Sequence, residues 1–128
     1  MAIDCIAEIP GAAELSDWFG GFPSFHDAKA EFQICSDGTG WFKASGFRMS
    51  DKVDAEGFRV LEKRFVAIFH FSEMMSVSIT DFMPGQIILG ELDIKKVDGN
   101  IRVDFIDTAY GASGCMEARY VRMEFQPT

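Results

Sequence analysis

Hydrophobic and polar residues alternate along most of this chain, a pattern typical of β-strands that bury one face. The clearest run lies over residues 28–35, where Ala28, Ala30, Phe32 and Ile34 share one side. Further strands are predicted over 41–49, 58–62, 65–71, 76–82, 88–94, 101–105 and 116–125. The run 65–71 is apolar on both faces, which predicts a strand in the middle of the sheet.

Turn-forming residues separate these runs. The pair Asp98-Gly99 lies between two alternating runs and predicts a tight hairpin with positive φ at both positions. A second hairpin turn is predicted over 36–40, and the polar stretch Ser50–Gly57 is predicted to be an exposed loop. Gly46 indicates a bulge or a close backbone contact, and the alternation slips between Tyr120 and Val121, which predicts a bulge there.

A single short helix is predicted near the N-terminus. Leu15, Trp18 and Phe19 recur at helical spacing, so we expect a helix that begins near Ala12 and ends at Gly20. Residues 1–9 are expected to be an edge strand or an unstructured lead-in. The fold prediction is a mainly β single domain, 1–128, with about seven antiparallel strands in a curved sheet or sandwich.

The chain changes from helix to strand at an aromatic corner. Pro23 cannot continue the helix, and it favours an extended backbone at the residue before it. The residues predicted to build this structural corner are Trp18, Phe22, Pro23, Phe25, His26 and Asp27.

The composition is acidic, with a formal charge of -8 from twenty acidic and twelve basic side chains. Such a surface disfavours nucleic acids and anionic membranes as partners, whereas a basic protein would be attracted to it. The charge also has a simpler interpretation, which is that it only keeps the protein soluble. Three cysteines without paired spacing indicate reduced thiols and a cytoplasmic location, and no signal segment or membrane span is predicted.

His26, Asp27 and Glu31 are the residue types that could bind a metal or transfer protons. On a regular strand, however, the imidazole of His26 faces away from the two carboxylates, so neither a catalytic site nor a metal site is predicted. Ser24 lacks the surroundings of a nucleophile, and Gly111–Gly114 lacks the lysine of a phosphate-binding loop. No cofactor is predicted.

Several short motifs resemble those of one known family. They are the run from Trp18 to Ala28 followed by Glu31, then 65–68, 79–82, Asp98-Gly99 and 109–111. In this order they are similar to the immunity protein 50 family of bacterial polymorphic toxin systems. The resemblance covers nearly the whole chain from Trp18 onward. It implies a small cytoplasmic β-rich protein that binds and neutralises a cognate toxin, without catalysis of its own.

Two other functions remain open besides such an inhibitor. One is a small-molecule-binding or structural β domain, with a pocket lined by Phe22, Phe25, Phe69 and Tyr110. The other is an enzyme that uses His26 and Asp27. The candidate contacts to a partner or pocket are Glu31, Asp107 and Tyr110, the expected partner is a basic toxin, and an unpaired edge strand makes a homodimer plausible.

Overall fold

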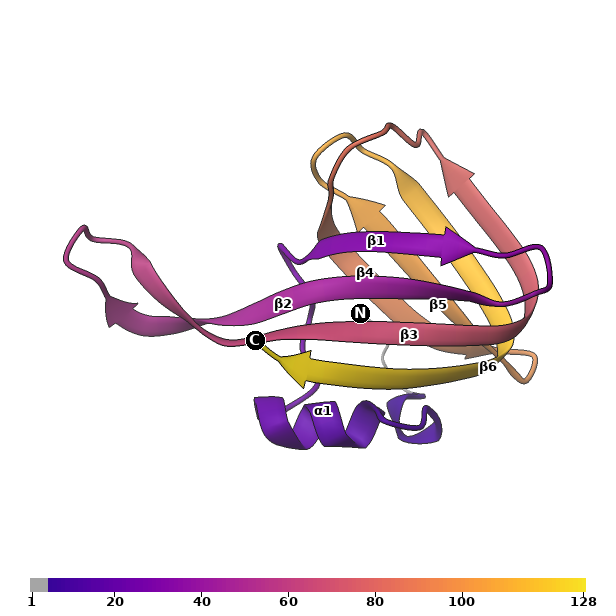
Figure 1. The fold of residues 1–128 in the computed structure, drawn as a ribbon, viewed down its shortest axis with the longest axis horizontal. Helices are drawn as coiled ribbons and strands as arrows, with labels where there is room; N and C mark the ends of the chain where they lie inside the picture. Colours follow the sequence, from indigo (N-terminus) through magenta and orange to yellow (C-terminus); the bar gives the residue numbers. More distant parts are fainter. Residues whose placement is uncertain (1–4) are drawn as a thin grey trace.

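The computed structural model describes residues 5–128, and within them the chain forms six strands and two short helical segments (Figure 1). The helical segments are a 3₁₀ turn, η1 (Ile6–Glu8), and an α-helix, α1 (Ala12–Phe19). The strands are β1 (Lys29–Ile34), β2 (Gly40–Val53), β3 (Arg59–Thr80), β4 (Ile87–Val97), β5 (Asn100–Asp107) and β6 (Ser113–Pro127). The prediction of a mainly β domain with one short helix is confirmed.

The six strands close into an antiparallel barrel in the order β1-β2-β3-β6-β5-β4. The last seam is short, because β1 meets β4 only at Lys29 opposite Ile88 and at Ala30 opposite Ile87. The two longest strands, β3 and β6, pair with each other over most of their lengths and take part in both halves of the barrel. In Figure 1, the half made by β1 and β2 lies in front, and the strands of the half made by β4 and β5 cross behind it.

Strand β3 corrects the predicted strand count. The three runs expected at 58–62, 65–71 and 76–82 fall within this one strand, which is 22 residues long, except for residues 58, 81 and 82 at their ends. Glu73 has a φ of 52°, and the register with β6 shifts between Met74 and Ser76. These features bend the strand without ending it, so β3 can turn from one half of the barrel into the other. The bulge predicted at Tyr120 and Val121 is therefore on the opposite strand, because those two residues pair in regular register.

Aromatic rings fill the barrel. Phe42, Phe69 and Phe105 have no more than 1% of their surface exposed, and the ring of Phe42 lies 5.3 Å from that of Phe105 and 6.3 Å from that of Phe69. Small residues make room for these rings. A Cβ on Gly46 would lie 2.6 Å from the ring of Phe65, and the register with β3 shifts between Gly46 and Arg48, so both alternatives expected at this glycine are found.

The N-terminal segment packs on β6. Ala12 and Leu15 are buried, the ring of Trp18 lies 5.5 Å from that of Phe125, and the N–H of Met123 donates to the carbonyl of Pro10. The helix has the predicted ends, with Gly20 in the left-handed conformation just after Phe19. Residues 1–4 of the expected lead-in lie outside the described residues, and Ile6–Glu8 is a 3₁₀ turn where an edge strand was one of the two expectations.

Gly11 lies close against the backbone of β6. It has a φ of 91°, and a Cβ there would overlap the carbonyl oxygen of Met123. Replacement of Gly11 with alanine is expected to lower the free energy of unfolding by about 2 kcal/mol, since backbone strain and steric overlap add. Denaturant titration of the purified variant measures this loss.

Gly57 offers a matched control. Its φ of 90° is nearly the same, but no atom lies within 4 Å of the position of its missing Cβ. Gly57→Ala is therefore expected to cost only about 1 kcal/mol, from the backbone conformation alone. Equal losses in the two variants would contradict the close packing of the N-terminal segment on β6.

Candidate functional site

The aromatic residues of the predicted corner are packed against the barrel. Phe25 is 4% exposed, and its ring lies 5.8 Å from that of Phe65 and 5.9 Å from that of Phe69. Phe22 covers Phe25 from outside at 5.7 Å, and Pro23 is buried. With Trp18 on Phe125, these rings hold the helix-to-strand transition onto the core.

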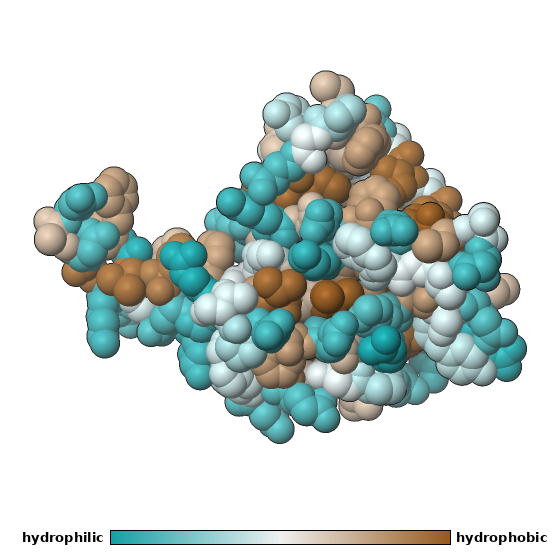
Figure 2. Space-filling model, in the orientation of Figure 1, coloured by the Kyte–Doolittle hydropathy of each residue, from teal (hydrophilic) through white to brown (hydrophobic). Residues whose placement is uncertain are grey.

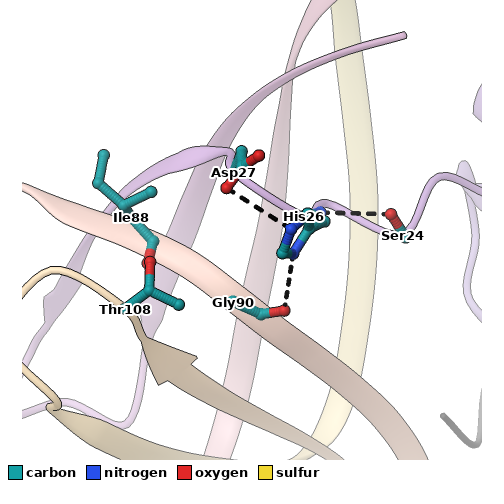
Figure 3. A network of polar contacts seen from close by, with 6 residues as sticks. All are labelled: Ser24, His26, Asp27, Ile88, Gly90 and Thr108. Atoms are coloured by element: carbon teal, nitrogen blue, oxygen red, sulfur yellow. Dashed lines mark hydrogen bonds and ion pairs between the residues drawn. The ribbon is translucent and has the colours of Figure 1, made fainter. Parts of the chain in front are cut away.

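His26 lies at the surface of this corner (Figure 3). Its Nδ1 is 3.1 Å from the carbonyl oxygen of Gly90 in β4, to which the tautomer protonated at Nδ1 donates. Its backbone N–H donates to the hydroxyl oxygen of Ser24, and its Nε2 lies 3.7 Å from a carboxylate oxygen of Asp27. His26 thus ties the corner to β4.

The expected direction of the His26 side chain is wrong. Regular alternation would place it on the same side as Ala28, but Ala28 is buried and the side chain of His26 is 64% exposed. Phe25 and Asp27 have φ values of 61° and 65°, which interrupt the strand on both sides of the histidine. Alternation predicts side-chain direction only where the backbone is extended throughout.

The surrounding backbone explains what the corner does for the fold. The N–H of Asp27 donates to the carbonyl of Leu89, and the N–H of Leu89 donates to the carbonyl of Ala28. From the other side, the hydroxyl and the N–H of Thr108 both donate to the carbonyl of Ile88 (Figure 3). These bonds reinforce β4 where its pairing with β1 is short.

Glu31 is directed to a different neighbour. It lies opposite Lys43 on β2, with 3.0 Å between a carboxylate oxygen and the ammonium nitrogen. Glu31 therefore does not join His26 and Asp27 in one cluster. Across the described residues, no group of three or more histidine, cysteine or acidic side chains is placed to hold a metal ion.

Asp107 was a candidate contact to a partner or pocket, and the structure places it in the interior at 3% exposure. Its carboxylate accepts hydrogen bonds from the N–H groups of Ile88, Ala109 and Tyr110. Burial alone would raise the pKa of this carboxyl, but these backbone donors together lower it below its ordinary value. Asp107 organises the loop between β5 and β6 and is not available to a partner.

Three of the four proposed pocket residues pack ring against ring, and Tyr110 does not join them. Phe25 and Phe69 belong to the packed core and Phe22 covers Phe25, whereas Tyr110 is 59% exposed in the loop after β5. Tyr110 remains a candidate surface contact. A pocket lined by these four residues is thus not formed.

The most accessible feature of the molecule is a β-hairpin that the sequence did not predict. Within residues 47–64, which we call the arm, a strand was expected to end at Met49, with an exposed loop over Ser50–Gly57 and a new strand over 58–62. In the structure β2 continues to Val53 and only 54–58 form the turn. From Arg48 and Glu62 outward, β2 and β3 pair only with each other. The arm projects away from the barrel (Figure 1).

The base and the tip of the arm are both ordered by specific contacts. At the base, the guanidinium of Arg48 lies 4.6 Å from the ring centre of Phe19, and the ammonium of Lys63 donates to the carbonyl of Trp18. At the tip, the carboxylate of Asp54 accepts from the N–H groups of Glu56 and Phe58. The arm is therefore a formed hairpin whose middle and tip lie free of the barrel.

Large apolar side chains are exposed along the arm. The exposed fractions are 51% for Met49, 60% for Val53, 68% for Phe58 and 38% for Val60. Figure 2 shows hydrophobic surface on the arm beside strongly hydrophilic residues. The signal in the sequence was the presence of apolar residues on both sides of the polar turn, which is typical of a hairpin rather than a loop.

Comparisons with other proteins add nothing to these geometric observations. No helix among the described residues is long and apolar enough to cross a membrane. Searches of protein-family models, curated proteins and solved structures found no match to this chain.

Proposed function

We propose that this protein is a non-enzymatic protein-binding module, an immunity-type inhibitor of a cognate bacterial toxin that acts in the cytoplasm. The observation that carries the proposal is the arm. An isolated two-stranded hairpin is marginally stable in water, and this one exposes Phe58 and Val53 to solvent. Exposed apolar residues gathered on a projecting element are typical of a surface that a partner covers. The resemblance to the immunity protein 50 family supports the same function.

The tip of the arm is acidic, which favours a basic partner, whereas the arm as a whole, 47–64, carries five basic and four acidic side chains. Its tip, residues 51–57, carries the carboxylates of Asp51, Asp54 and Glu56 and the single ammonium of Lys52. With the overall charge of -8, this tip would be attracted to a positively charged surface and would orient the encounter. The proposed partner is therefore a toxin domain with a basic cleft that admits the arm.

The test is co-expression with the toxin encoded immediately upstream. The chain is expected to restore growth, and the double variant V53S/F58S is expected to weaken the complex by about 30-fold, because apolar anchors dominate such interfaces. Growth rescue and titration calorimetry of the purified pair measure the two effects. Both replaced residues are exposed, so the thermal midpoint should stay close to that of the unmodified chain.

Met75→Ser is the matched control, since Met75 is 63% exposed on β3 outside the arm. It should bind as the unmodified chain does. Equal binding by V53S/F58S and by the unmodified chain would exclude the arm as the contact, and failure of the unmodified chain to bind or rescue would count against the inhibitor function. Light scattering of the chain alone would reveal a homodimer that covers the arm.

A further inference from the structure

A groove of about 720 Å³ lies on the barrel, and no residue of the arm lines it. One wall is formed by β2, β3 and β6, which contribute Trp41, His70 and Tyr120. The other wall comes from the turn between β4 and β5 and from η1, where the ammonium of Lys96 pairs with the carboxylate of Glu8 at 2.7 Å. The volume lies within the range of small-molecule sites.

Flat side chains form a platform in this groove. Trp41 on β2 lies directly opposite His70 on β3, and His70 lies directly opposite Arg122 on β6. One step along the same face, Tyr120 lies opposite Ser72. The residue between Tyr120 and Arg122, Val121, is buried, so the tyrosine and the arginine share the outer face.

The groove is positive although the protein is acidic. Its lining holds three cations, Lys96, Arg119 and Arg122, and one carboxylate, Glu8, and these four give a local balance of +2. Within the described part of the chain, no carboxylate forms an ion pair with either arginine. Arg119 lies over the ring of Tyr120 at 5.6 Å.

The carboxylate that contacts His70 belongs to Glu124, outside the lining of the groove. A carboxylate oxygen of Glu124 lies 2.6 Å from Nε2 of His70. The two unpaired guanidinium groups are therefore the ones left to meet a ligand, and guanidinium groups bind phosphate through paired hydrogen bonds.

We propose that this groove binds a single nucleotide, with its base on the aromatic platform and its phosphate at Arg119 and Arg122. Aromatic rings beside arginines are the pair of features that nucleotide binding uses, because every base has a face that stacks. Strand spacing separates Trp41 from Arg122 by two strands, or about 10 Å, which leaves room for base and phosphate together. The overall charge of -8 repels a long polyanion, so a mononucleotide is favoured over a nucleic acid.

The test is a titration with AMP that follows tryptophan fluorescence. The chain has two tryptophans, so Trp18→Phe leaves Trp41 as the only indole reporter. Saturable quenching is expected with a dissociation constant below about 1 mM. Adenosine and inorganic phosphate, each of which supplies half of the interaction, are expected to bind about tenfold more weakly or worse.

Two charge-reversal variants distinguish binding in the groove from the effect of the protein's overall charge. Arg122→Glu is expected to raise the dissociation constant for AMP about tenfold or more. Arg59→Glu, an equal change of charge on the exposed arm, should leave that constant within about twofold of the value for the unmodified chain. Arg122 is exposed and unpaired, so its variant should keep its thermal midpoint, and calorimetry with AMP repeats the comparison.

Four outcomes would overturn the proposal. They are the absence of saturable quenching by about 10 mM AMP, inorganic phosphate binding as tightly as AMP, equal effects of the two charge reversals, and tighter binding of an oligothymidylate than of AMP. None of these outcomes bears on toxin binding by the arm, which V53S/F58S tests separately.

Discussion

Truncation of Phe69 to alanine is expected to lower the free energy of unfolding by about 4 kcal/mol. The side chain has no exposed surface, and its ring contacts those of Phe25 and Phe42, which come from the corner and from β2. Removing the ring would leave a cavity where three segments meet, and rigid strands cannot collapse into it. Thermal unfolding should show a midpoint lower by roughly 15 °C.

Phe58→Ala is the control for this prediction, because it removes the same ring from a site that is 68% exposed on the arm. The free energy of unfolding of Phe58→Ala is expected to stay within about 0.5 kcal/mol of that of the unmodified chain. If Phe69→Ala lowered the free energy of unfolding by less than about 1 kcal/mol, the ring would not be at the centre of a packed barrel.

Features that depend on neighbouring residues were predictable from the sequence. The helix from Ala12 to Phe19 follows from three apolar residues at helical spacing and a glycine after them. The tight turn at Asp98-Gly99 has positive φ at both positions, as the residue types require. The inward direction of Phe65, Phe69 and Phe71 follows from alternation along an extended backbone.

Predictions failed where one strand changes direction without ending. Ser72 and Glu73 look like a break between strands, but a bulge there lets β3 continue round the barrel. The polar stretch from Ser50 to Val53 looks like a loop, yet it extends β2 into the arm. Composition alone does not distinguish a solvated hairpin from a loop, since both expose polar residues.

The candidate sites show a second limit. The row of Trp41, His70 and Arg122 depends on the register of three strands that are far apart in the chain. Alternation gives the face of each residue but not its opposite neighbour, because a shift of two residues keeps every face and changes every pair. Asp107 shows the same limit, since its donor Ile88 comes from another strand.

Replacement of Asp107 with alanine is expected to lower the free energy of unfolding by about 3 kcal/mol at neutral pH. The variant leaves the N–H groups of Ile88, Ala109 and Tyr110 without their acceptor. Water cannot easily replace the carboxylate, because this site is buried and Asp107 itself is only 3% exposed. The loop between β5 and β6 and the start of β4 would loosen together. Denaturant titration measures the loss, and Glu91→Ala, an exposed carboxylate on β4, should behave as the unmodified chain does.

The loss of unfolding free energy caused by Asp107→Ala should depend on pH in a defined direction. The pKa of Asp107 is lowered on folding, so the unfolded chain takes up the proton more readily than the folded one. The stability that the carboxylate supplies is therefore complete above its unfolded pKa of about 4 and is lost as the pH falls through the lower folded pKa. The gap between the unmodified chain and Asp107→Ala should narrow below about pH 4, whereas a gap that stayed constant down to about pH 2 would show that the interactions of Asp107 do not depend on its charge.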